Sequence, residues 1–123
     1  MPVGSRNIRP EVTQAVERAA ELALDRKAAD VVALDLATIS GATDYFLLAS
    51  GRSDVQVKAI ADHIVEEMKK EGIRPEHIEG LQRGRWVLID YIDFVVHVFH
   101  EEARDFYQLE VLWGDAPRRE FEN

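Results

Sequence analysis

Hydrophobic and polar positions alternate along this chain with two different periods, and the changes of period divide it into helices and strands. From Pro10 onward the apolar residues recur at helical spacing, which predicts an amphipathic helix. Its predicted buried stripe consists of Val12, Ala15, Val16, Ala19, Leu22 and Ala23. A second helical pattern runs from Asp54 to Lys70, with its own stripe at Val57, Ile60, Ala61, Ile64 and Met68.

Both ends of the second predicted helix carry stop signals. Ser53 and Gln56 have the spacing of a capping box, in which each side chain accepts a hydrogen bond from a free backbone N–H. At the other end, Lys69 and Lys70 complement the negative end of the helix dipole. Gly72 then suits a left-handed cap, because glycine adopts positive φ without a steric penalty.

The remaining apolar runs have the length and the β-branched or aromatic content of strands. They span residues 31–36, 45–49 and 78–81, followed by a hairpin (86–89 and 94–99) that bends between Asp90 and Asp93. The first two runs are joined by a short turn-rich loop, so we expect them to pair antiparallel. A final helix should follow, with Phe106, Leu109 and Trp113 on one face. This order predicts an α/β (α+β) fold, one mixed sheet of about five strands with helices packed on it.

The chain is long enough for a single domain with one core. We expect an N-terminal arm at residues 1–9, the domain at 10–114 and a flexible tail at 115–123, because the tail shows no apolar periodicity. No apolar stretch is long enough to span a bilayer. The N-terminal stretch has no apolar signal-peptide core, and cysteine is absent. These features predict a cytoplasmic protein without a membrane partner.

The charge balance changes the expected class of partner. Acidic residues outnumber basic ones 23 to 15, for a formal net charge of −8. Proteins that bind nucleic acid neutralise its phosphates with clustered Lys and Arg side chains. This sequence has no such basic cluster interleaved with aromatic residues. We therefore expect no direct binding of nucleic acid and, for a protein that works near RNA, a basic protein surface as the partner.

Three patterns in the sequence are candidates for a catalytic or ligand site. The turn Ser50–Asp54 precedes a helix N-terminus, where anions can bind, but it lacks the spacing of the phosphate-binding glycine motifs. Four aspartates (Asp35, Asp44, Asp90 and Asp93) could hold a divalent ion, yet Asp is more often a turn residue. His97 interrupts an apolar strand, and its expected role is that of a buried histidine bonded to a carbonyl or a nearby Asp.

The last third of the chain concentrates aromatic residues, and there the chain resembles a known family. The matching motifs are TDYFLLASG (43–51), AIADHI (59–64), EGLQRGRWVLIDY (79–91) and DFVVHVFHEEARDFYQLEVLW (93–113). Together they resemble the ribosomal silencing factors, also called the Iojap family. A strand histidine followed by this acidic, aromatic helix is the most specific of the four.

The resemblance implies a fold similar to that of nucleotidyltransferases, without their catalytic carboxylates, and therefore no enzyme activity and no cofactor. It implies binding to the large ribosomal subunit through large-subunit ribosomal protein fourteen, at the face where the small subunit docks. Blocking subunit association would then repress translation under nutrient limitation. The contact residues that the matched motifs suggest are Trp86, Asp90, Tyr91 and Phe99, with Glu102 as an acidic rim.

Two alternatives remain at this point. One is a nucleotidyltransferase-like enzyme or nucleotide-binding protein that uses Ser50–Asp54 and the scattered acids. The other is a homodimer, in which an exposed edge of the hairpin pairs with its copy.

The chain departs from the family pattern in one place. Where the family reads Asp-aromatic-Gly-Asp, this chain has Asp90, Tyr91, Ile92 and Asp93. Glycine supplies positive φ at no cost, whereas a β-branched residue resists it. Ile92 is therefore predicted to be strained if its φ is positive, and to be ordinary if the turn needs no positive φ.

Overall fold

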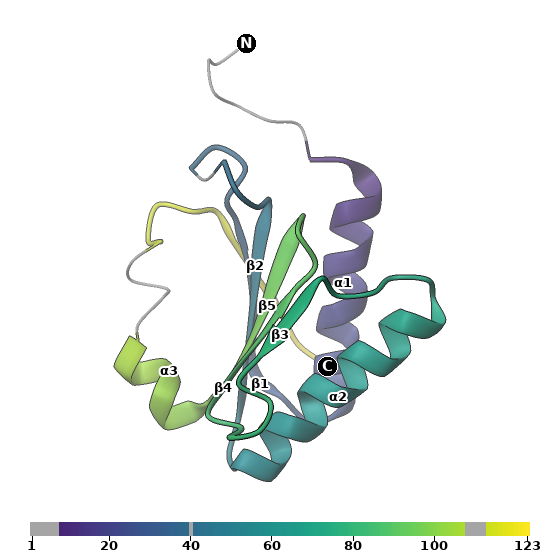
Figure 1. Cartoon of the computed structure of the whole chain (residues 1–123). Helices are drawn as coiled ribbons and strands as arrows, with labels where there is room; N and C mark the ends of the chain where they lie inside the picture. The colour runs from purple at the N-terminus through teal and green to yellow at the C-terminus, as the bar shows by residue number, and fades with distance from the viewer. Residues whose placement is uncertain (1–7, 40, 108–112) are drawn as a thin grey trace.

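A computed structural model describes residues 8–39, 41–107 and 113–123. The described residues form one mixed sheet with two long helices on one of its faces (Figure 1). In chain order the elements are α1 (Pro10–Asp25), β1 (Ala29–Asp35), β2 (Tyr45–Gly51), α2 (Asp54–Lys70), β3 (His77–Glu79), β4 (Trp86–Asp90), β5 (Phe94–His100), α3 (Glu101–Tyr107) and β6 (Arg118–Phe121). Residues 1–7 of the predicted arm lie outside this description, as do Leu109 and the side chain of Phe106 from the last predicted helix face.

The described residues make a six-stranded sheet in the order β3-β4-β5-β2-β1-β6. The two central strands β2 and β5 run parallel, with Tyr45 opposite Phe94. Every other pair of neighbours is antiparallel, including β1 with β2 and the β4–β5 hairpin. The mixed α/β sheet and the antiparallel first pair are therefore confirmed, with one strand more than expected.

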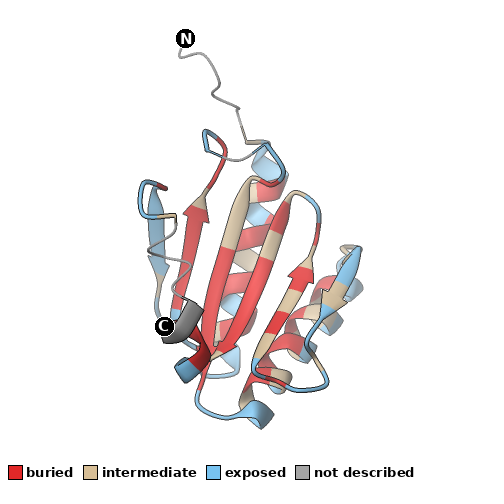
Figure 2. Cartoon of the chain, turned by 60° about the vertical axis from the view of Figure 1, so that its left-hand side comes forward, coloured by how far each residue is buried: buried red, intermediate tan, exposed pale blue. Residues whose placement is uncertain are grey.

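Helices α1 and α2 lie side by side across one face of the sheet and bury the predicted stripes against it. Figure 2 shows the two helices behind the sheet, with the opposite face of the strands turned forward. The strand residues that point toward the helices complete the core: Val31, Ala33, Leu47, Ala49, Val87, Ile89, Phe94, Val96 and Val98. Side chains alternate between faces along a strand, so the residues between these point away from α1 and α2.

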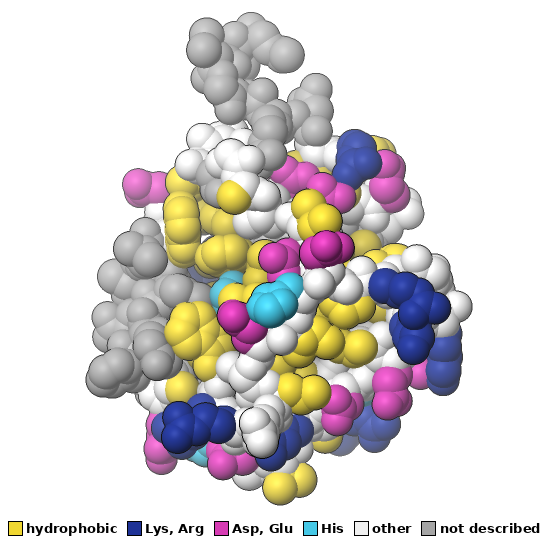
Figure 3. All heavy atoms as spheres, in the orientation of Figure 1, with side chains coloured by type: hydrophobic (Ala, Val, Ile, Leu, Met, Phe, Trp, Pro, Cys, Tyr) yellow, Lys and Arg dark blue, Asp and Glu magenta, His cyan; other side chains and the backbone are white. Residues whose placement is uncertain are grey.

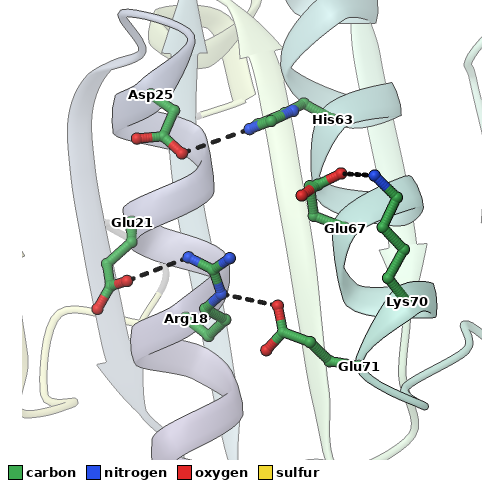
Figure 4. A network of polar contacts seen from close by, with 7 residues as sticks. All are labelled: Arg18, Glu21, Asp25, His63, Glu67, Lys70 and Glu71. Atoms are coloured by element: carbon green, nitrogen blue, oxygen red, sulfur yellow. Dashed lines mark hydrogen bonds and ion pairs between the residues drawn. The ribbon is translucent and has the colours of Figure 1, made fainter.

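Polar contacts connect the exposed sides of the two helices. In Figure 4 the Arg18 guanidinium reaches from α1 to Glu71, which follows α2, with 2.9 Å between Nε and Oε2. His63 of α2 lies 3.4 Å from Asp25 at the end of α1. Exposed ion pairs of this kind contribute at most about 1 kcal/mol each, so burial of the apolar stripes is the main stabilising term.

Both predicted caps of α2 are present. Ser53 Oγ accepts a hydrogen bond from the Gln56 N–H at 3.1 Å, and Gln56 Oε1 accepts one from the Arg52 N–H at 2.7 Å. At the other end, Gly72 has φ +85°. The Ile73 N–H then donates to Met68 O at 2.9 Å, which satisfies a terminal carbonyl of the helix.

The prediction of a flexible tail at residues 115–123 is wrong for β6. This strand pairs with β1 along the sheet edge, from Val31 opposite Phe121 to Leu34 opposite Arg118. Arg119 bonds Glu17 of α1, and its guanidinium lies 4.6 Å above the Phe121 ring. The strand lacks apolar alternation because an edge strand is held mainly by backbone hydrogen bonds and tolerates charged side chains. Periodicity therefore gave no signal for it.

The suggested dimer through a free hairpin edge also needs correction. Within the described part of the chain, β2 pairs with all of β5 and β3 pairs with residues 88–90 of β4, so most of the hairpin edge is already covered. The sheet edges are β3 and β6 instead. Among the described helices, none has both the length and the apolar character needed to cross a bilayer.

The tip of the hairpin contains the strained residue. Ile92 has φ +71° and its side chain is 58% exposed. The Asp93 N–H donates to Tyr91 O at 2.9 Å, which closes a γ-turn centred on Ile92. Ile92 therefore has the positive φ for which the sequence predicted backbone strain.

Candidate docking face

The face of the sheet that points away from α1 and α2, here called the open face, is the candidate site. Four apolar side chains on it remain half-exposed: Phe46, Trp86, Leu88 and Val95. They come from the three neighbouring strands β2, β4 and β5. Cross-strand register places Val95 between Phe46 and Asp90, and His97 between Leu48 and Leu88. Aromatic and aliphatic groups that are half-exposed on a rigid sheet can bury further area against a partner.

Trp86 is held by two side chains beneath and beside it. Its ring stacks on Phe99, its cross-strand partner, with centroids 5.2 Å apart and an interplanar angle of 26°. Its indole Nε1–H donates to His97 Nδ1 at 3.0 Å. Because an indole N–H can only donate, the accepting Nδ1 carries no proton and His97 is the Nε2–H tautomer.

His97 is buried, with 4% of its surface exposed. Burial disfavours the charged imidazolium and lowers the pKa of His97 to about 4, so the ring is neutral at physiological pH. The prediction of a buried histidine is confirmed, but its described partner is the Trp86 indole rather than a carbonyl or an aspartate. Its Nε2 is buried without a hydrogen-bond partner.

Phe99, one of the suggested contact residues, is buried in the free chain, with only 1% of its surface exposed. It lies between α3 and the sheet with Leu34, Leu48 and Ala103, so it supports Trp86 from below. Strand alternation places Phe99 on the same side of the sheet as His97, and there Ala103 of α3 and the Trp86 ring pack on it. Contact with a partner would need Phe99 to leave its packing.

Tyr91 also lies away from the open face. Its residue is 7% exposed, and its ring stacks on Phe94 on the helix side of the sheet, with centroids 4.7 Å apart. Burial raises the pKa of the Tyr91 hydroxyl to about 12. Trp86 and Tyr91 differ in parity, so only one of them can face α1 and α2, and that one is Tyr91. The assignment of Tyr91 as a surface anchor is therefore wrong for the free chain.

Asp90 and Glu102 lie at opposite ends of the open face. Asp90 is half-buried and Oδ1 accepts a hydrogen bond from the Ile92 N–H at 2.7 Å, so this carboxylate holds the hairpin turn. Glu102 is exposed and lies 3.7 Å from Arg85, which precedes Trp86. His77 and Glu79 of β3 add a further pair at 3.1 Å beside β4. In Figure 3, acidic and histidine side chains lie next to hydrophobic ones near the centre of the view.

Sequence reasoning missed Phe46, Leu88 and Val95 as members of this face. The signal was present, because Leu88 and Asp90 have the parity of Trp86. What the sequence did not supply was the register, which brings Val95 and Phe46 next to Asp90. The sequence also did not reveal which helix lies on this side of the sheet. Among the described helices, the long α1 and α2 lie on the other side and the short α3 lies on this one.

The turn at Ser50–Asp54 is explained by packing and capping. The N–H of Arg52, which precedes the N-cap, donates to the Gln56 side chain, and the N–H of Gln56 in the first helical turn donates to Ser53 Oγ. A Cβ at Gly51 would come within 2.9 Å of Val57, so the small residue permits the close approach of β2 and α2. Nothing in this geometry favours a phosphate site.

The four aspartates are spread over separate turns. Asp35 accepts a hydrogen bond from the Ala37 N–H, and Asp93 accepts one from Arg9 at 2.6 Å. Among the described residues, no group of three His, Asp or Glu side chains is close enough to hold a metal ion.

Comparison with known proteins agrees with this fold. The family model described as ribosomal silencing factor during starvation matches residues 9–123. The ribosomal silencing factor RsfS of Bacillus subtilis is 50% identical over 93 residues, which cover 76% of this chain and 79% of that protein. A crystal structure from Bacillus halodurans is 42% identical, with a TM-score of 0.75, and the match covers 92% of this chain and 100% of that one.

A more distant relative comes from mouse. It is named mitochondrial assembly of ribosomal large subunit protein 1 and is 34% identical over 74 residues, 58% of this chain and 32% of that protein. Since the family model spans the sheet, the helices and β6, the match covers every element of the fold described above. The chain therefore belongs to the ribosomal silencing factor family, a family of ribosome-associated regulators of translation.

Proposed function

We propose that the open face binds the large ribosomal subunit through large-subunit ribosomal protein fourteen, and that the bound protein sterically blocks association with the small subunit. The observation that carries this proposal is the half-exposed Trp86 on an apolar sheet face, in a chain of this family. A half-exposed tryptophan held on rigid strands is a typical interface anchor, because it buries much area at a small cost in conformational entropy.

Charge supports a basic partner. The chain carries a net charge of −8, and Asp90, Glu79 and Glu102 lie around the apolar centre. Acidic groups at the rim speed and orient encounter with a basic protein more than they add affinity. The association rate should therefore fall as salt is raised, because rim charges are screened beyond a distance of about 8 Å at physiological ionic strength.

A large subunit that carries this protein would repress translation by excluded volume, without any catalytic step. The name of the mouse relative refers to the large ribosomal subunit, which is consistent with the choice of subunit. No observation at Ser50–Asp54 favours the alternative of nucleotide binding, since the helix N-terminus is capped by side chains.

The test is co-sedimentation with purified large subunits, followed by a light-scattering assay of subunit joining. The parent protein should co-sediment with large subunits and slow joining. Trp86→Ala should remain folded and bind at least about tenfold more weakly, as expected for loss of an anchor. Val55→Ala is the matched control, because Val55 is an exposed apolar residue (78%) on α2, away from the open face, and it should bind normally.

A further inference from the structure

His97 occupies the centre of the open face but is not exposed on it. It lies in register between Leu88 on β4 and Leu48 on β2, two apolar neighbours that offer no side-chain hydrogen bond. Its ring also contacts Phe46 edge-on at 4.6 Å and stacks over Phe99 at 5.9 Å. The imidazole is thus surrounded by hydrocarbon and aromatic rings, and Nδ1 is used by the indole of Trp86.

This is a costly way to fill a core position. A buried N–H without an acceptor loses its hydrogen bond to water and gains nothing in return, and Nε2–H of His97 is in that situation. Leucine or phenylalanine would fill the same apolar space without an orphaned polar group. A purely structural role in packing therefore does not explain the histidine.

The contact with Trp86 does explain it. Stacking on Phe99 sets the plane of the indole but leaves open which edge of the ring points outward, because stacking is weakly directional. The hydrogen bond from Nε1 to His97 Nδ1 at 3.0 Å removes that freedom, since it is made in one ring orientation. Burial keeps the imidazole neutral, so Nδ1 stays an acceptor.

We infer that His97 is a positioning residue for docking: it fixes the Trp86 indole in the orientation that the ribosomal partner meets. This inference rests on the proposed function of the open face. A fixed side chain binds more tightly than a mobile one because less conformational entropy is lost on association. His97 itself does not touch the partner.

A double-mutant cycle tests the inference. Trp86→Phe keeps an aromatic ring but removes the N–H, and His97→Leu removes the acceptor. Each single variant should weaken binding to purified large subunits by about three- to tenfold, the equivalent of one hydrogen bond. The double variant should bind no more weakly than Trp86→Phe, because His97 has nothing left to position. Independent losses that multiply in the double variant would overturn the inference.

Two further variants separate positioning from stability. His97→Asn places a carboxamide oxygen close to the position of Nδ1 and should restore binding to within about twofold of the parent, given retention of the hydrogen bond. Val96→Ala removes a buried side chain on the helix side of the same strand. It should lower stability and leave binding unchanged. If Val96→Ala weakens binding as much as His97→Leu does, the effect of His97 is one of stability and the inference fails.

The indole N–H resonance gives a readout that does not depend on the ribosome. The chain has two tryptophans, so the Trp86 signal is the one that disappears in Trp86→Phe. In His97→Leu this N–H should shift upfield and exchange faster with water, whereas an unchanged signal would contradict the hydrogen bond. If the parent does not bind large subunits, the proposed function and the inference both fail. If it binds and the cycle is additive, only the inference fails.

Discussion

Replacing Ile92 with glycine should stabilise this protein, although it removes a β-branched apolar side chain. Ile92 has φ +71° at the hairpin tip, and three short hydrogen bonds around it hold that conformation in place. A non-glycine residue in this region costs about 1–3 kcal/mol, and a β-branched one belongs in the upper half of that range.

Two terms oppose the gain. Glycine loses more backbone entropy on folding than other residues, which costs about 0.5–1 kcal/mol. The Ile92 side chain is 58% exposed, so it buries less than half of its surface. A fully buried isoleucine contributes about 1.5–3 kcal/mol, and the part lost here is therefore about 1 kcal/mol. With the strain at about 2.5 kcal/mol, the middle of that upper half, a net stabilisation of about 0.5–1 kcal/mol remains for Ile92→Gly.

The comparison with alanine isolates the backbone. Ile92→Ala loses the same side-chain burial but keeps a Cβ at positive φ, so the glycine variant should be more stable than the alanine variant by about 0.5–1 kcal/mol. Val55, an exposed β-branched residue in the first turn of α2, provides the opposite case. There Val55→Gly should be less stable than Val55→Ala by about 0.5–1 kcal/mol, because glycine weakens a helix.

Urea unfolding followed by tryptophan fluorescence measures all four variants. A change in the midpoint at constant slope reports a change in stability. The prediction is an inversion of sign between positions 92 and 55. If alanine is more stable than glycine at both positions, the strain at Ile92 is not real.

Three further predictions follow from buried or paired groups. The pKa of His97 is lowered to about 4 from an ordinary 6.5, so the unfolded chain protonates this imidazole more readily than the folded one. The free energy of unfolding is therefore highest above pH 6.5 and falls between pH 6.5 and 4 by up to about 3 kcal/mol. Over this range the stability of the parent should fall more steeply than that of His97→Leu, and parallel curves would contradict the prediction. Removal of residues 118–123 should unpair the β1 edge, lower the unfolding midpoint and speed hydrogen exchange along β1, whereas unchanged exchange there would show that β6 does not stabilise the sheet. Ser53→Ala should cost about 1 kcal/mol of unfolding free energy through loss of the α2 cap, and a loss below about 0.3 kcal/mol would show that the cap is dispensable.

The sequence was sufficient where one local signal dominated. The α2 helix begins and ends at the residues that the capping box and Gly72 predicted. The two apolar stripes are buried as expected, because helical periodicity records which face meets the sheet. Strand alternation likewise predicted that Trp86 and Tyr91 face opposite sides of the sheet. It did not predict which of the two faces α1 and α2.

The sequence was insufficient where non-local pairing decides the outcome. Strand β6 is held by backbone bonds to β1, a partner more than eighty residues away, so its own side chains carry no alternating pattern. Phe99 was suggested as a contact residue by its position in the matched motif, but the register places it beneath Trp86. The Trp86–His97 bond joins residues on adjacent strands, and no spacing rule anticipates which polar atom an indole will meet.

The most direct test of the central claim is the binding of Trp86→Ala to purified large ribosomal subunits, measured beside the parent and Val55→Ala. The parent and Val55→Ala should co-sediment with the large subunit and slow subunit joining, while a folded Trp86→Ala should bind at least about tenfold more weakly. Equal binding by all three proteins would contradict the assignment of the open face. Failure of the parent to bind at all would contradict the proposed function.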